Sequence, residues 1–561
     1  MRSKIQQKLS LQKTQRVRSS TILKLTLTAI YVVALLAFSL LSPSHSQVEA
    51  SSGVTYYVSK NGNNSTGMSW QSAWKELDQI HWSQIKPGDT ILLDGGGSSM
   101  TYTTTLTIGT SGASGRPVVI ARSTDAGHNG TITLFGGRST PLPYCGQSGY
   151  NFQTSGVLQA GINLGNNAYI VIDGKSWHGI NIYGHDGSGI VFGTGSHDNL
   201  VRGMQIFDEG TAGQQSNGSW NPSGPYLINV HGYNQTFQYM DLHDGGEDAF
   251  QPTNINNITV QLSWLHDARV LPSHPGTAFN QCNHDDGMQI WTGKPVSNLT
   301  FEQDVVGPGK ENGLILGNGL VSVSNVKITN SLFIDAGANN IWGSPATNWT
   351  INHITSFAEN QNLIIDGSGH SVTNSLFYGG LMSFHGSIAS QSNNCQWQTG
   401  GNTLSGQTAN PQFASSLSAF PLGISTDVRE SPTIATLTNL DFTMQPTSPC
   451  SGLGSSITSI SNFLSTVGGT KVFATPTPKH KPTPTPTIVV PTQNPVIIAT
   501  TGGGSNNPAQ PAGGSTPAAR KQAMILWLWI FLGVFVCIGA GGILWFTLFS
   551  KRSRARRRHR L

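Results

Sequence analysis

The chain has 561 residues, of which 11% are charged and 66 are glycine. This composition excludes a coiled coil or a helical array, and a hydrophobic content of 37% argues against wholesale disorder. The two ends, 1–50 and 520–561, hold 16 of the 32 basic residues and one of the 27 acidic ones, so residues 51–519 carry a net charge of −10. We therefore expect no nucleic-acid binding, and we expect that a polyanionic partner is held only through bound cations.

The first fifty residues are typical of a secretion signal. Seven basic residues lie between Arg2 and Lys24, an apolar run follows from Leu25 to about Leu41, and Val48-Glu49-Ala50 offers a cleavage site. We expect residues 1–50 to be a signal peptide, with an uncleaved N-terminal anchor as the alternative.

Residues 51–470 are expected to form one ectodomain. Its best helical pattern is the segment 72–80, which we expect to form a helix that caps the open end of a solenoid. Farther along, segments that begin with Asn-x-Thr or Asn-x-Lys recur, and each is followed by an alternating apolar strand, a turn rich in Gly, Asn and Asp, and a second strand. The five segments start at Asn234, Asn257, Asn298, Asn325 and Asn348.

The spacing of these segments identifies the repeating unit. Three of the four steps are 23 or 27 residues, which is the length of one coil in a solenoid of short strands. The fourth step is 41 residues and is explained by a loop inserted at 268–283. The pattern predicts an all-β fold, a right-handed parallel β-helix.

Several motifs resemble the secreted right-handed β-helix proteins of the pectate-lyase-like superfamily. Residues 56–62, 69–75 and 87–93 resemble the opening of these proteins, Ile172-Asp173-Gly174 resembles an early coil, and residues 440–449 resemble the closing coil. The resemblance covers about residues 54–455 and implies the fold. It leaves the activity open, because this fold hosts lyases, hydrolases, epimerases and adhesins.

Acidic residues recur just before the second strands. In register, one column contains Glu247, Asp285 and Glu311, and its neighbour contains Asp248, Asp286, Asn312, Asn339 and Asn362. Successive coils lie about 4.8 Å apart, so the five carboxylates crowd one patch and repel one another. We expect them to bind Ca²⁺, a hard cation that prefers oxygen ligands. The alternative for the second column is an internal ladder that hydrogen-bonds the turns.

Three basic residues are the catalytic candidates beside this cation. Lys310 stands one coil from His284 and is the candidate base, with a surface salt bridge to Glu311 as its alternative role. Arg269, on the inserted loop, is the candidate clamp for a substrate carboxylate or an alternative base. The order of Trp264–Asp267, Asp285–Ile290 and Lys310–Gly317 is loosely similar to pectate lyases, although the R-x-P-x-x-R motif of that family is absent.

Two His-Asp pairs form a further candidate cluster. His243-Asp244 and His266-Asp267 are 23 residues apart and therefore stack on consecutive coils. With His284 they are candidates for acid–base chemistry or metal binding, and the alternative is a turn-stabilising ladder.

The C-terminal segments indicate a membrane anchor. Residues 471–522 form a linker rich in Pro, Thr and Gly, and 523–549 contain an uncharged apolar run long enough to span a bilayer. The basic tail 550–561 is expected in the cytoplasm, which places the ectodomain outside the cell. Four of the five cysteines (Cys145, Cys282, Cys395 and Cys450) lie in that ectodomain, and their pairing is left open.

These observations favour a single-pass cell-membrane protein, expected to be monomeric, that acts on an extracellular or cell-wall polysaccharide. The leading hypothesis is a Ca²⁺-assisted polysaccharide lyase of the uronan or pectate type. The alternatives are a non-catalytic glycan-binding or adhesion protein and a glycoside hydrolase that uses two of the same acids.

Overall fold

The computed structural model describes most of the predicted ectodomain. It covers residues 53–468, apart from 145, 154, 268–284, 291–292, 318, 335–336, 359 and 415–437. The predicted signal segment, the linker, the apolar run and the basic tail lie outside these residues. Among the residues described, no helix has the length and hydrophobicity needed to cross a membrane.

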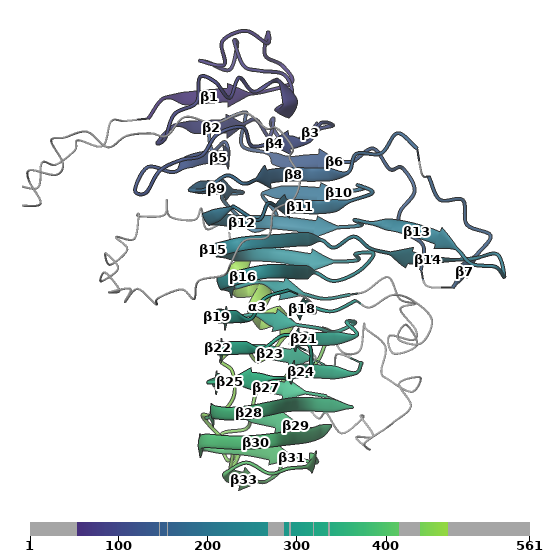
Figure 1. Cartoon of the computed structure of the whole chain (residues 1–561), viewed down its shortest axis with the longest axis vertical. Coiled ribbons are helices and arrows are strands. Elements are labelled where there is room, and N and C mark those ends of the chain that lie inside the picture. Colours follow the sequence, from purple (N-terminus) through teal and green to yellow (C-terminus); the bar gives the residue numbers. More distant parts are fainter. Residues whose placement is uncertain are drawn as a thin grey trace, which may run out of the picture. The chain divides into compact units, whose positions relative to one another are not determined.

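The chain winds through three parallel sheets, so that 30 strands join into one continuous wrapped sheet, which confirms the predicted all-β parallel β-helix (Figure 1). The first sheet contains β1 (Thr55–Val58), β2 (Thr90–Leu93), β5 (Val118–Arg122), β9 (Ile170–Asp173), β19 (Val296–Glu302), β22 (Val323–Thr329), β25 (Ala346–Thr347) and β26 (Thr350–Asn352). The second contains β3 (Ser99–Tyr102), β6 (Thr131–Phe135), β10 (Ile180–Tyr183), β17 (Trp264–Leu265), β20 (Val305–Val306), β23 (Leu332–Ile334), β27 (Thr355–Phe357), β29 (Leu376–Tyr378), β31 (Asn394–Trp397) and β33 (Gly406–Thr408).

The third sheet contains β4 (Leu106–Thr107), β8 (Ala160–Gly165), β11 (Ser188–Phe192), β18 (Met288–Ile290), β21 (Asn312–Leu316), β24 (Asn339–Gly343) and β32 (Gly400–Gly401). Five long strands bend from one sheet into the next: β12 (His197–Phe207), β15 (Ile228–His243), β16 (Phe250–Gln261), β28 (Gln361–Thr373) and β30 (Leu381–Ser392). The interior between the three sheets is filled by apolar side chains, which form one long core.

The repeat predicts the register of the coils correctly from Phe250 to Ile341 and is off by one residue in the next coil, where Gln361 pairs with Asn339. Phe250, Met288, Leu314, Ile341 and Leu363 pair from one coil to the next and are all fully buried. The recurrent asparagines mark the turns. Asn234 and Asn257 have φ of 55° and 57°, a left-handed conformation that asparagine tolerates, and Asn257 Nδ2 donates to Asn234 Oδ1 at 2.6 Å.

The predicted cap helix at 72–80 is wrong in its secondary structure. Only Leu77–Gln79 form a single 3₁₀ turn, η1. Trp74 instead extends and bridges Val58 of β1 in parallel, with its N–H donating to the carbonyl of Tyr57 at 3.1 Å. The segment therefore covers the free edge of β1 with backbone hydrogen bonds, and this pairing prevents Trp74 from joining a helix.

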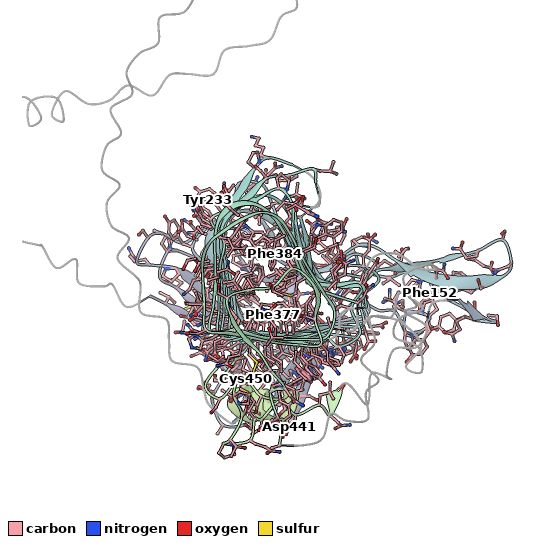
Figure 2. All side chains as sticks on the ribbon, turned by 90° about the horizontal axis from the view of Figure 1, so that it is seen from below. Phe152, Tyr233, Phe377, Phe384, Asp441 and Cys450 are labelled. Carbon is pink, nitrogen blue, oxygen red and sulfur yellow. A yellow bond between two sulfur atoms is a disulfide. The ribbon has the colours of Figure 1, made fainter. Side chains whose placement is uncertain are left out.

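The C-terminal residues form a second core that the sequence did not predict. Helix α3 (Ile460–Val467) begins after Ser459, whose side chain accepts a hydrogen bond from Asn462 N at 3.0 Å. Its apolar face joins residues of the second sheet in a separate buried cluster. A disulfide between Cys395 and Cys450 links β31 to this segment, which lies outside the ring of coils (Figure 2).

A small antiparallel sheet projects from the coils (Figure 1). It is made of β7 (Gln147–Ser148), β13 (Thr211–Gln214) and β14 (Ser219–Ser223). The buried Arg138 guanidinium anchors the base of this projection by donating to the carbonyl of His185 at 3.0 Å and by lying 5.2 Å from the ring of Phe152.

We expect Phe237→Ala to destabilise the protein strongly. Phe237 is fully buried and its ring contacts those of Phe192 and Phe250, so truncation leaves a cavity that costs about 3–5 kcal/mol. Urea unfolding monitored by circular dichroism measures the change. Leu320→Ala is the control, because Leu320 is 66% exposed and its loss should cost no more than about 0.5 kcal/mol. Equal effects of the two substitutions would contradict the assigned core.

Candidate functional site

The structure brings the five predicted acidic residues together at the turns between the second and third sheets. Strand pairing from β16 through β18 to β21 aligns the residues that precede each strand. The aligned residues are Glu247, Asp248, Asp285, Asp286 and Glu311. The N–H of Glu311 donates to the carbonyl of Asp285 at 2.8 Å, which confirms that these two stand on adjacent coils.

The second column is an internal hydrogen-bond ladder. Asp248 Oδ1 accepts from Asp286 N at 2.9 Å and its Oδ2 accepts from Gln251 at 3.2 Å. Asp286 Oδ1 accepts from Asn312 N and Nδ2 at 3.0 and 2.7 Å, and its Oδ2 accepts from Gln289 at 3.0 Å. Because both carboxylates are fully buried and hydrogen-bonded through both oxygens, their contacts are those of the ladder alternative.

The ladder continues through Asn339 and then departs from the prediction. Asn339 Nδ2 donates to Asn312 Oδ1 at 2.6 Å. In the next coil, Gln361 pairs with Asn339 and the predicted Asn362 lies one position farther along the strand. Asn362 instead accepts from Ser356 and donates to the carbonyl of Gly379 at 2.6 Å.

Lys310 is buried in an ion pair. Its Nζ lies 2.6 Å from Asp285 Oδ1, and Lys310 is only 1% exposed. This burial does not fit the surface salt bridge to Glu311 that the sequence offered as the alternative role of Lys310. The geometry places one cation against the first column and fixes the orientation of the Asp285 carboxylate.

Two carboxyl groups of the first column, those of Asp285 and Glu311, hold protons more tightly than usual. Burial, partly offset by Lys310, raises the pKa of Asp285 to about 7. Burial and the neighbouring charges of Asp286 and Asp285 raise the pKa of Glu311 to about 8. In the ladder, burial and the charge of Asp286 raise the pKa of Asp248 well above its ordinary value. The patch therefore favours either bound protons or a bound cation at neutral pH.

Arg269 and His284 lie outside the described residues. The segment that contains them, 268–284, joins Asp267 at the end of one coil to Asp285 at the start of the next strand. Their roles as clamp and as catalytic partner therefore stay predictions.

The sequence interpretation missed Asp241. It lies two residues before His243 on β15, so both side chains point to the same face of the strand. Asp241 Oδ1 lies 2.8 Å from His266 Nε2, and the hydrogen bonds from His178 and His266 keep the pKa of Asp241 low despite its burial. The Asp-x-His spacing was the available signal, and it becomes informative only when the next coil is placed beside it.

No protein-family model and no curated protein matches this chain. Among solved structures, the chain is similar to the pectate lyase Pel9A (16% identity, 61% of this chain and 74% of the other, TM-score 0.30). It is also similar to a rhamnogalacturonan lyase, with 13% identity, coverage of 61% of this chain and 87% of the other, and a TM-score of 0.40. A third similar structure is PfbA, a surface adhesin of Streptococcus pneumoniae, with 10% identity, coverage of 54% of this chain and 79% of the other, and a TM-score of 0.34.

We expect the metal-free protein to lose stability as the pH rises. The folded-state pKa values of Asp285 and Glu311, about 7 and about 8, lie above the ordinary values of 3.8 and 4.5. Folding thus favours the protonated forms, and this contribution is complete below about pH 4 and is lost as the pH rises through 7 and 8. In chelator, the Tm of wild type should fall between about pH 5 and 9 more steeply than that of Asp285→Asn/Glu311→Gln.

Differential scanning fluorimetry of the full chain measures these Tm values. The control Asp78→Asn changes an exposed carboxylate in the first coils and should follow wild type. Parallel pH profiles for wild type and the double variant would contradict the assignment of the titrating groups.

Proposed function

We propose that the chain is a carbohydrate-active protein of the cell surface, a Ca²⁺-assisted lyase that cleaves an acidic polysaccharide at the first column of carboxylates. One observation carries the proposal: Glu247, Asp285 and Glu311 come from three adjacent coils, and Lys310 forms an ion pair with Asp285. A net charge of −10 over residues 51–519 repels a polyanion unless cations mediate the contact.

The residues of the first column fit Ca²⁺, whereas the ladder residues fit it less well. Glu247 and Glu311 are half-buried, which leaves their carboxylates within reach of an ion from solvent, and Asp285 stands between them. Asp248 and Asp286 are fully buried and already accept hydrogen bonds through both oxygens. We therefore narrow the five predicted ligands to Glu247, Asp285 and Glu311, with the ladder holding their backbone in place.

When bound, Ca²⁺ would supply electrostatic stabilisation of the uronate carboxylate during proton abstraction. In this proposal Lys310 remains the base. A cation that competes for Asp285 weakens the ion pair that now occupies the amine of Lys310. Arg269 and His284 belong to the segment that precedes Asp285 in sequence. They are proposed to complete the site as clamp and catalytic partner.

A glycoside hydrolase is the second candidate, and Glu311 is the observation that favours it. A half-buried carboxyl whose pKa is raised to about 8 carries a proton at neutral pH, as the general acid of a glycosidase must. Asp285 on the adjacent coil would be the second carboxylate. A purely adhesive protein would use the same patch to bind glycan without cleaving it.

Calorimetric titration of the full-length chain with Ca²⁺ tests the cation site. We expect one site in wild type, and binding at least about tenfold weaker in Asp285→Asn/Glu311→Gln because two of the three ligand carboxylates lose their charge. The control Asp78→Asn should bind as wild type does. Absence of Ca²⁺ binding in wild type would overturn the lyase mechanism and shift the weight to a hydrolase or an adhesin.

Digestion of a panel of uronic-acid and neutral polysaccharides separates the three activities. A lyase leaves an unsaturated uronate that absorbs ultraviolet light, and this product should require Ca²⁺ and disappear in Lys310→Met. Reducing ends without that absorbance would identify a hydrolase, and their release should disappear in Glu311→Gln. Binding of glycan without any product in wild type would identify an adhesin.

A further inference from the structure

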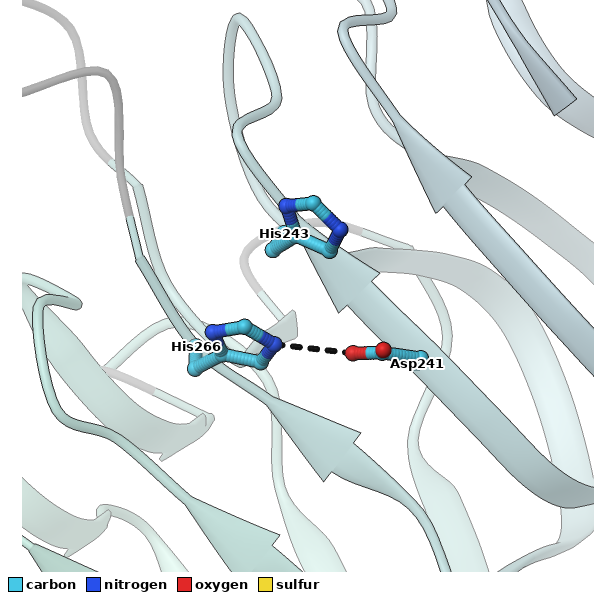
Figure 3. A group of neighbouring side chains, drawn as sticks. All are labelled: Asp241, His243 and His266. Carbon is cyan, nitrogen blue, oxygen red and sulfur yellow. Dashed lines mark hydrogen bonds and ion pairs between the residues drawn. The ribbon is translucent and has the colours of Figure 1, made fainter. Parts of the chain in front are cut away.

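A second cluster of polar side chains lies on the second sheet, on the coils that precede the segment 268–284 in sequence. Asp241 and His243 project from β15, and His266 directly follows β17 (Figure 3). Pairing of Asp241 with Trp264 and of Leu242 with Leu265 brings the two imidazoles side by side, with ring centroids 4.9 Å apart. The cluster therefore joins two successive coils.

Each histidine has its Nδ1 bound to the aspartate that follows it in sequence. His243 Nδ1 lies 2.8 Å from Asp244 Oδ2, and His266 Nδ1 lies 2.8 Å from Asp267 Oδ2. A carboxylate on Nδ1 fixes the ring orientation and leaves Nε2 as the nitrogen that can face a ligand. Histidines that bind a metal through one ring nitrogen commonly donate the other ring N–H to a carboxylate in the same way.

The Nε2 atoms of the two histidines have different partners. His266 Nε2 is 2.8 Å from Asp241 Oδ1, and His243 Nε2 accepts a hydrogen bond from Gln205 Nε2 at 3.0 Å. His243 Nε2 therefore presents a lone pair. Asp241, His243 and His266 each place one possible ligand atom within 4.8 Å of those of the other two.

We propose that Asp241, His243 and His266 bind one divalent transition-metal ion of the Zn²⁺ class. Two imidazole nitrogens and one carboxylate oxygen match the donors that Zn²⁺ takes, with a water left to complete a tetrahedral shell. Ca²⁺ prefers an all-oxygen shell and is excluded by these donors. The site is thus separate in chemistry from the column of Glu247, Asp285 and Glu311, and it does not depend on the proposed function.

Burial and position suggest what the ion does. Asp241 and His266 are 4% and 6% exposed, whereas the His243 side chain is 15% exposed and offers the route of entry. An ion held by two residues of β15 and one that follows β17 clamps adjacent coils together beside the inserted segment. Without the ion, Asp241 is hydrogen-bonded to both His178 and His266. A bound metal would replace the hydrogen bond between His266 Nε2 and Asp241.

The chain contains an internal control for the His-Asp pair itself. His197 Nδ1 lies 2.8 Å from Asp198 Oδ2, which reproduces the geometry of the other two pairs. The His197 ring, however, stacks on Tyr233 with centroids 4.8 Å apart and belongs to no metal-ligating group among the described residues. The His-Asp pair is therefore a local turn device, and the convergence on Asp241 is what distinguishes the proposed site.

The test is equilibrium binding of Zn²⁺ to the chelator-treated full-length chain in mild detergent, with Co²⁺ absorption as a probe of the coordination. We expect wild type to bind one more Zn²⁺ ion than His243→Gln, and to show tetrahedral Co²⁺ bands that this variant lacks. Asp244→Asn should weaken binding about 10–100-fold, because it removes only the carboxylate behind His243. Zn²⁺ should also raise the Tm of wild type and not that of His243→Gln.

Two further variants keep the outcomes distinct. His197→Gln should bind Zn²⁺ as wild type does, and Asp285→Asn/Glu311→Gln should retain Zn²⁺ even if its Ca²⁺ binding is lost. The proposal is overturned if wild type and His243→Gln, both folded by circular dichroism, bind equal Zn²⁺. It is also overturned if His197→Gln loses as much Zn²⁺ as His243→Gln.

Discussion

Every site in this protein depends on the parallel register between successive coils. Each coil places one residue beside its equivalent in the next coil, at a spacing of about 4.8 Å. Inside the ring this constraint produces continuous columns of apolar side chains, such as Phe250, Met288 and Leu314. At the turns the same constraint produces columns of polar residues. The core and the candidate sites therefore share one geometric cause.

Stacking equivalent residues is costly when they are charged, and the turns between the second and third sheets show several ways of reducing the repulsion. In the ladder, the two acids Asp248 and Asp286 are followed by the neutral amides Asn312 and Asn339. Lys310 compensates Asp285 from inside the protein. On the second sheet, histidines flank Asp241, and the hydrogen bonds of His266 to Asp241 and Asp267 outweigh its burial and raise the pKa of His266 to about 9. In the first column, burial raises the pKa of Asp285 and Glu311, so these carboxyl groups are the ones expected to take up a cation or a proton.

The elements outside the coils decide which faces remain accessible. Helix α3 and the disulfide-linked C-terminal segment cover the outer face of the second sheet over β20, β23 and β27, so that Phe357 and Tyr378 belong to a second core. The antiparallel projection of β7, β13 and β14 leaves the coils at Gly210, just after buried Glu209. The projection borders the turn that carries Glu247, where Gly246 N donates to the carbonyl of Glu209 at 2.8 Å, and Glu247 stays half-buried.

The sequence by itself determined the parallel coils, their register from Phe250 to Ile341 and the convergence of five acids, because a repeat fixes which residues become neighbours along the axis. It did not determine the role of each acid, since the burial and hydrogen bonds that separate Asp286 from Glu311 depend on side-chain packing. Contacts across the fold were equally hidden: Lys310 with Asp285, Asp241 with His266, and the backbone bridge that replaced the expected helix at Trp74. Lys310 and Asp285, like Asp241 and His266, are 25 residues apart, about one coil, so the repeat places them on adjacent coils. Which side chains then meet depends on their orientation and burial, and only the tertiary structure decided that.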